Sequence, residues 1–150
     1  MSTDTSQVDV RGPRFSAWIT TTVLVVTLLV SAFSQYAAAA ILGAQAVIFA
    51  ISALRGPRSS PYGALFRTFV APRLGPVTER EPVAPLKFAQ LVGLAFAVPG
   101  TIGFAAGIPL LGVIATGFAL FASFLNAAFG ICLGCQLYPL VARFRRAPAA

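Results

Sequence analysis

The sequence predicts an all-α membrane protein, in which four transmembrane helices form two antiparallel hairpins with a short cytoplasmic amphipathic helix between them. Composition supports this fold class. Of the 150 residues, 57% are hydrophobic and only 10% are charged, and the mean hydropathy is +0.84. A water-soluble domain carries about a quarter charged residues to cover its surface. The distribution of charge agrees, because every Lys and Arg lies outside four long apolar segments.

The four predicted spans cover residues 15–33, 37–54, 88–107 and about 110–131, within one domain that takes up residues 1–150. Each span has roughly 18 to 22 residues, the length at which a helix crosses a hydrocarbon core of about 30 Å. The connections inside each pair of spans are so short that they allow only tight turns. We therefore expect each pair to be an antiparallel hairpin, with a cytoplasmic connection, 55–87, between the two pairs.

The basic residues all fall on one side of this arrangement, before the first span, in the connection 55–87, or after the last span. The positive-inside rule then predicts a multi-pass plasma (inner) membrane protein with cytoplasmic N- and C-termini. Because topology accounts for the basic surplus, we expect the lipid bilayer as a partner and no nucleic acid. The residues are Arg11, Arg14, Arg55, Arg58, Arg67, Arg73, Arg80, Lys87, Arg143, Arg145 and Arg146.

The connection between the hairpins has two predicted parts. Ser60 followed by Pro61 is typical of a helix start, with a capping residue and a proline in the first turn. Apolar residues then recur at helical spacing over 62–70, which predicts a short amphipathic helix on the membrane surface. Residues 75–85 are rich in proline, so we expect an irregular linker there.

Two carboxamide side chains lie deep within the predicted spans, Gln45 in the second span and Asn126 in the fourth. An amide in hydrocarbon is costly unless it is hydrogen-bonded, so both should face the interior of the bundle and could contact one another. Interhelical hydrogen bonding is the first interpretation, and substrate binding is the second. Since the spans hold no charged residue, we do not expect ion-coupled transport.

Small residues recur four apart in the spans, as at Gly103 and Gly107 and at Ala39 and Gly43. Such spacing lets helices approach closely. The contact could lie within the bundle or between protomers, so a homo-oligomer stays open.

Cys132 and Cys135 form the only local motif with chemical content. The Cys-x-x-Cys spacing is that of dithiol redox centres, and the pair is expected at the cytoplasmic interface, where thiols are kept reduced. Transient redox chemistry, metal binding and inert thiols are the alternatives. If the fourth helix ran through the motif, its C-terminal end would oppose a thiolate. A break at Gly130 or Gly134, with a new helix starting near Cys132, would favour one.

No cofactor and no metal site is predicted. A zinc site normally needs four ligands, whereas this chain has two cysteines and no histidine. The sequence therefore does not decide whether the protein is an enzyme.

Five short motifs are shared with a known family. They are Arg11-Gly12-Pro13-Arg14-Phe15, residues 55–63, Pro72-Arg73-Leu74, Asn126-Ala127-Ala128-Phe129-Gly130 and Cys132-Leu133-Gly134-Cys135. On these motifs the chain resembles domain of unknown function 4395, an actinobacterial membrane family, from Val10 to Tyr138. The resemblance implies a four-helix bacterial inner-membrane protein associated with thioredoxin-like or sulfur-transfer proteins, and no established activity. Members often have an acidic residue after the second cysteine, where this chain has Gln136.

Three functional hypotheses follow. In the first, Cys132 and Cys135 exchange electrons or sulfur with a soluble thioredoxin-like or sulfurtransferase protein. In the second, the protein is a membrane scaffold or assembly subunit with incidental thiols. In the third, it is a channel or transporter for a small solute, in which Gln45 and Asn126 line the path and the cysteines lie at its inner mouth.

Overall fold

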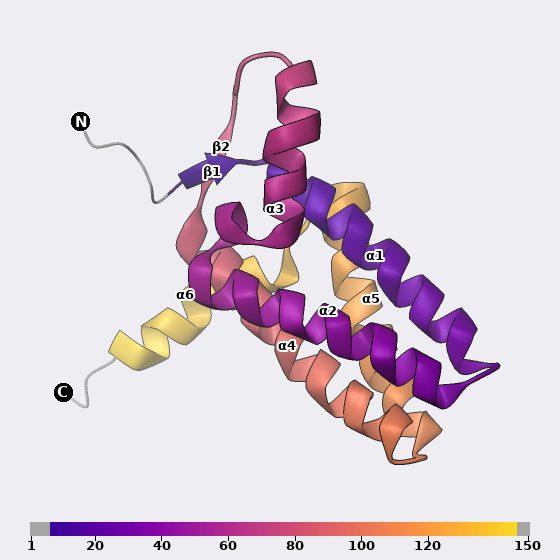
Figure 1. Ribbon diagram of the computed structural model, residues 1–150. Helices are drawn as coiled ribbons and strands as arrows, with labels where there is room; N and C mark the ends of the chain where they lie inside the picture. Colours follow the sequence, from indigo (N-terminus) through magenta and orange to yellow (C-terminus); the bar gives the residue numbers. More distant parts are fainter. Residues whose placement is uncertain (1–6, 147–150) are drawn as a thin grey trace.

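Long helices make up most of the computed structural model, which describes residues 7–146 (Figure 1). Shorter helical turns follow α2 and α3, at Pro57–Ser59, Phe66–Val70 and Ala71–Arg73. The labelled elements are β1 (Gln7–Asp9), α1 (Arg11–Ser31), α2 (Gln35–Arg55), α3 (Pro61–Leu65), β2 (Arg80–Pro82), α4 (Val83–Ala105), α5 (Pro109–Phe129) and α6 (Leu133–Arg146).

Within the described chain, α1, α2, α4 and α5 are the 4 helices long and apolar enough to cross a membrane. A helix of this size is about 31 to 35 Å long, which matches the hydrocarbon core. The chain thus has the helices of a multi-pass membrane protein. The predicted ends need correction, because α1 and α4 begin about one turn before the apolar segments do. Arg11 and Lys87 therefore belong to helix ends, where hydropathy alone gives no signal.

The four long helices form a closed ring, in which α1 packs on α2 and α5, and α4 packs on the same two helices. Both short connections, 32–34 and 106–108, lie at one end of this bundle, and β1, β2, α3 and α6 gather at the other end (Figure 1). Leu24, Leu42, Phe49 and Phe104 are buried in the centre.

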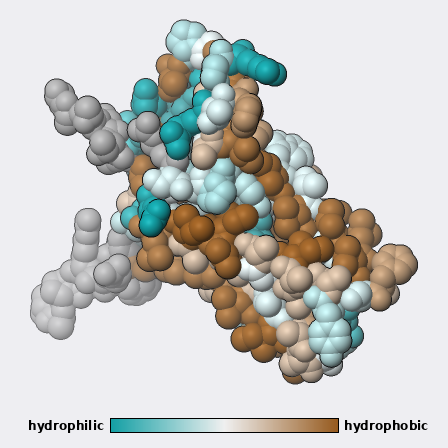
Figure 2. Space-filling view, in the orientation of Figure 1, coloured by the Kyte–Doolittle hydropathy of each residue, from teal (hydrophilic) through white to brown (hydrophobic). Residues whose placement is uncertain are grey.

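The outer surface of the bundle is hydrophobic. Figure 2 shows apolar residues over the long helices and hydrophilic residues gathered around β1, β2 and α3. Large apolar side chains such as Leu29, Val47 and Phe118 are exposed there. A soluble monomer rarely exposes so much contiguous apolar surface, so lipid is the solvent that suits it.

The linker prediction for residues 75–85 is wrong at Arg80–Pro82, which forms β2 and pairs with β1 in an antiparallel sheet. The register places Gln7 opposite Pro82 and Asp9 opposite Arg80. The partner strand comes from the start of the chain, and a three-residue segment has too little periodicity to predict such a pairing. The fold is therefore helical except for this small sheet.

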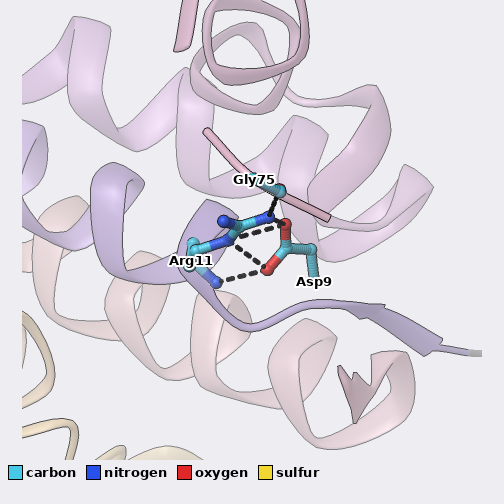
Figure 3. Close-up of polar contacts among 3 residues, drawn as sticks. All are labelled: Asp9, Arg11 and Gly75. Carbon is cyan, nitrogen blue, oxygen red and sulfur yellow. Dashed lines mark hydrogen bonds and ion pairs between the residues drawn. The ribbon is translucent and has the colours of Figure 1, made fainter. Parts of the chain in front are cut away.

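Arg11 joins the start of α1 to the segment around Gly75, and Asp9 holds its guanidinium in place (Figure 3). Its carboxylate accepts hydrogen bonds from the backbone N–H of Arg11 at 3.0 Å and from the guanidinium of Arg11, with Nη2 at 2.7 Å. The same Nη2 donates to the carbonyl oxygen of Gly75 at 3.1 Å. These hydrogen bonds from Arg11 lower the pKa of Asp9.

The helix start predicted at Ser60 is confirmed, since the hydroxyl of Ser60 accepts a hydrogen bond from the N–H of Gly63 at 2.9 Å. Beyond α3 the helix widens into a π-turn at Phe66. Phe66 is buried against the bundle, with its ring centroid 5.8 Å from that of Phe15, whereas Phe69 is exposed. The apolar residues of this segment are thus divided between the bundle and the outer surface.

Candidate functional site

The chain breaks just before the cysteine motif. Gly130 has a φ of 72°, a left-handed conformation that ends α5 at Phe129. The N–H of Gly130 donates to the carbonyl oxygen of Asn126 at 3.0 Å, which closes the helix end. A separate helix, α6, then begins at Leu133. Of the two geometries that the sequence left open, the structure has the break at Gly130.

Cys132 occupies the capping position of α6. Its carbonyl oxygen accepts a hydrogen bond from the N–H of Gln136 at 3.0 Å, and its Sγ accepts one from the N–H of Cys135 at 3.1 Å. A disulfide joins Cys132 to Cys135, whose Cα atoms are 5.1 Å apart. Because N–H groups and the positive end of the dipole meet at a helix start, this geometry favours a thiolate at Cys132 once the bond is reduced.

Gly134, between the two cysteines, allows α6 to pack closely on α4. A Cβ at Gly134 would lie 2.6 Å from Cα of Ala89, so a larger residue would push the helices apart. The ring of Tyr138 packs edge-on against Phe88, with centroids 5.9 Å apart. The motif is thus held against a long helix and does not lie on a free tail.

Arg14 brings a positive charge to the same turn. Its Nη2 donates to the carbonyl oxygen of Ala127 at 3.2 Å, and its Cζ lies 3.9 Å from the position of a Cβ on Gly130. The sequence analysis missed this contact because α1 and the end of α5 are adjacent only in the folded chain. The arginine itself was visible in the first motif of the family resemblance.

Cys132, Leu133 and Gly134 line a cavity of about 370 Å³ that all four long helices also line. No Asp, Glu, Lys or Arg of the described residues lines it. Its wall instead carries neutral polar side chains and several aromatic rings. The polar side chains, besides Ser60 and Tyr62, are Ser16, Thr20, Ser52, Gln90, Ser123 and Asn126.

The two predicted carboxamides have different surroundings. Gln45 is 1% exposed, and its Oε1 accepts a hydrogen bond from the hydroxyl of Tyr62 at 2.6 Å. Its Nε2 has no partner among the described residues. Asn126 lines the cavity, whereas Gln45 does not. The two carboxamides are not paired with each other, because Gln45 Oε1 is bonded to Tyr62 and Gln45 Nε2 has no described partner.

Tyr62 is a site residue that the sequence analysis placed at the membrane surface instead. It lines the cavity as well as contacting Gln45. Burial raises the pKa of Tyr62, and its hydroxyl is the donor in the hydrogen bond to Gln45. Its position in the sequence offered one clue. Tyr62 directly follows the Ser60-Pro61 helix start, and the first turn of α3 packs against the bundle.

Comparison with known proteins identifies the family. The sequence profile described as "Domain of unknown function (DUF4395)" matches residues 8–143. The chain belongs to this family. The DUF4395 match contains both cysteines and every residue named above on the cavity wall. No curated protein matches the chain, and no solved structure does. DUF4395 membership together with the four apolar helices describes a membrane protein of unknown activity.

Proposed function

We propose that this DUF4395 protein is a thiol redox component of the plasma membrane, whose Cys132–Cys135 pair exchanges electrons with a soluble thioredoxin-like protein. The observation that carries the proposal is the place of Cys132 as the cap of α6, with the N–H of Cys135 donating to its Sγ. A cysteine pair in the first turn of a helix has the arrangement that suits a reversible disulfide. A sulfurtransferase, delivering sulfur to the same thiolate, is the alternative partner.

The exchange is a balanced thiol–disulfide reaction. A thiolate of the partner attacks one sulfur of the Cys132–Cys135 disulfide, and a mixed disulfide forms as the other sulfur leaves as a thiolate. The second thiol of the partner then displaces the membrane protein, so the partner is oxidised and Cys132 and Cys135 are reduced. The cap position stabilises the thiolate that this reaction needs, whichever direction it runs.

We also propose that both termini and α6 face the cytoplasm. The basic residues of the described chain occur at the helix ends and in the elements on the side of α6, away from the connections 32–34 and 106–108 (Figure 1). This distribution supports a cytoplasmic placement through the positive-inside rule. In a reducing compartment the pair would cycle rather than remain a permanent disulfide.

The test is the thiol state of the pair in inverted membrane vesicles. After dithiothreitol treatment, two thiols should react with a maleimide reagent. Mild oxidation with diamide should re-form the disulfide and abolish the reaction of both thiols. Cys132→Ser and Cys135→Ser should each have one thiol, and at least one of them should trap a partner as a mixed disulfide in cells. Gln136→Ala is the matched control and should behave as the unmodified chain.

Thiols that stay in one state under both reagents would rule out the proposal. A persulfide on Cys132 or Cys135, in place of a mixed disulfide, would identify the sulfurtransferase alternative. Both outcomes can be read by mass spectrometry of the peptide that contains the motif.

A further inference from the structure

The cavity beside Cys132 has a wall of unpaired polar groups. Within residues 7–146, no hydrogen bond joins the side chains of Ser16, Thr20, Ser52, Gln90, Ser123 or Asn126 to another protein group. Outside the cavity, the hydroxyls of Thr27 and Thr116 donate to their own helix, whereas the buried hydroxyl of Thr21 has no partner among the described residues. Thr20 and Ser52 are only 6% and 4% exposed. In the described part of the chain, the fully buried side-chain atoms without a partner belong to other residues, Thr21, Gln35 and Gln45, so the unpaired groups of the wall are open to the cavity. Polar groups away from bulk water are nearly always hydrogen-bonded, and these are free to bond a ligand in the cavity.

The remainder of the wall suits a flat, apolar molecule. Phe49, Phe96, Phe118 and Phe121 contribute aromatic rings, and the rings of Phe96 and Phe118 stack with centroids 5.7 Å apart. Phe118 and Phe121 are each 59% exposed, so the cavity reaches the outer face of the bundle, which lipid covers. Its volume of about 370 Å³ is within the range of small-molecule sites. With no charged lining residue in the described chain, the ligand should be uncharged.

We propose that this cavity binds a membrane quinone, whose ring lies next to Cys132 and whose tail extends into the lipid between α4 and α5. A quinone is neutral and planar, and its two carbonyl oxygens accept hydrogen bonds of the kind that Asn126, Gln90 and the free hydroxyls can donate. The inference rests on the proposed function, because it names the second electron partner of the same cysteine pair.

The reaction balances as a two-electron, two-proton exchange. The Cys132 thiolate, which is the sulfur on the cavity wall, adds to a ring carbon of the quinone and forms a C–S bond. The Cys135 thiolate then attacks Sγ of Cys132, and the S–S bond forms as the C–S bond breaks. The electron pair of that bond stays on the ring, which takes up the two protons released by the thiols. The products are the disulfide and the quinol.

Binding can be measured apart from redox chemistry in the full-length Cys132→Ser/Cys135→Ser double variant. The single tryptophan of the chain, Trp18, lies on α1 between the cavity residues Ala17 and Thr20, so quinone binding should quench its fluorescence. Decylubiquinone should quench saturably, and decanol, which has the chain without the ring, should not displace it. Gln90→Ala and Asn126→Ala should each weaken binding about five- to tenfold, the effect of losing one hydrogen bond. Gln136→Ala, outside the cavity, should have no effect.

Turnover is measured with the reduced wild-type chain in lipid vesicles under anaerobic conditions. One decylubiquinone should be reduced for each pair of thiols lost, and Gln90→Ala should slow this oxidation but leave oxidation by diamide unchanged. Failure to quench, or quenching equal in all cavity variants, would overturn the quinone site even if diamide and dithiothreitol still cycle the thiols. Displacement by decanol would show a site for lipid chains instead. Thiols that do not cycle with the soluble reagents would contradict the proposed function, whatever the quenching shows.

Discussion

At the scale of single residues, the hydrogen bond from Tyr62 to Gln45 joins α3 to the middle of α2. Tyr62→Phe keeps the ring and removes only the hydroxyl. Gln45 would then lose its one described side-chain partner at a site that is 1% exposed. We expect the free energy of unfolding to fall by about 1 to 3 kcal/mol, the usual cost of an unsatisfied buried polar group.

Unfolding of the detergent-solubilised full chain, followed by circular dichroism, measures this loss. Tyr36→Phe is the matched control, because Tyr36 is 77% exposed and should tolerate the change. Equal stability of the two variants would contradict the role given to the Tyr62 hydroxyl.

Asp9 should make the strand end of the molecule sensitive to acid. The hydrogen bonds from Arg11 lower the pKa of Asp9 in the folded chain. A lowered folded-state pKa means that the stabilisation is present above the ordinary carboxyl pKa and is lost as the pH falls through the folded-state value. Hydrogen-exchange protection of residues 7–11 should therefore decrease in acid, and Asp9→Asn should abolish that dependence.

Glu81 provides a control of opposite sign. Burial in β2, with a smaller contribution from Glu79, raises its pKa. The contribution of Glu81 to folding stability is therefore largest at low pH, and it is lost as the pH rises through the pKa of Glu81 in the folded chain. Glu81→Gln should increase protection near neutral pH, and a decrease would show that the carboxylate is needed there.

At the scale of helices, α4 and α5 pack closely through glycine. A Cβ at Gly112 would lie 2.5 Å from the ring of Phe104, whereas one at Gly117 on the same helix would meet nothing within 4 Å. Gly112→Ala should therefore destabilise the protein by about 1 to 3 kcal/mol through overpacking. Gly117→Ala should be neutral or stabilising by up to about 1 kcal/mol, because alanine is the better helix former. Thermal unfolding of the two variants side by side tests this contrast.

The long helices could be predicted from the sequence because a lipid-spanning helix requires a long segment without charged residues, and such segments are visible in the amino-acid composition. It predicted small residues at helix contacts but not their partners. Gly103 does pack against Gly112 of α5, whereas Gly107 has a φ of 76° and lies in the turn after α4. The start of α6 could not be decided, since Gly130 fits either a continuing helix or a left-handed cap until the packing of Gly134 on Ala89 is known.

At the scale of the whole molecule, the one-sided charge leads to a topology prediction. Reporters fused after Ala150 and inserted within residues 75–85 should both be active as cytoplasmic reporters, because the basic residues gather on that side. A reporter inserted between Phe33 and Ser34, in the first short connection, is the control and should give the periplasmic signal. A periplasmic signal from either of the first two fusions would overturn the proposed orientation.

The candidate site shows the limit of prediction from sequence at this scale. Cys132 and Asn126 were identified as separate features, but the cavity that both of them line is formed by all four long helices, the start of α6 and the segment around Ser60, which meet only in the folded chain. Arg14 and Tyr62 joined the site for the same reason. Their residue types were unremarkable in the sequence, and their neighbours in space are far away along the chain.

The pairing of β1 with β2 has a consequence for how the protein is made. Residues 7–9 are synthesised before α1, α2 and α3, whereas their partner strand is synthesised after these helices. β1 therefore has no partner strand while α1 and α2 are synthesised and enter the membrane. Once β2 is synthesised, its pairing with β1 joins the start of α1 to the start of α4. Because this pairing and the contacts of α1 and α2 with α5 and α4 all join the two halves, the native contacts of the first half are complete only after the second half has been synthesised.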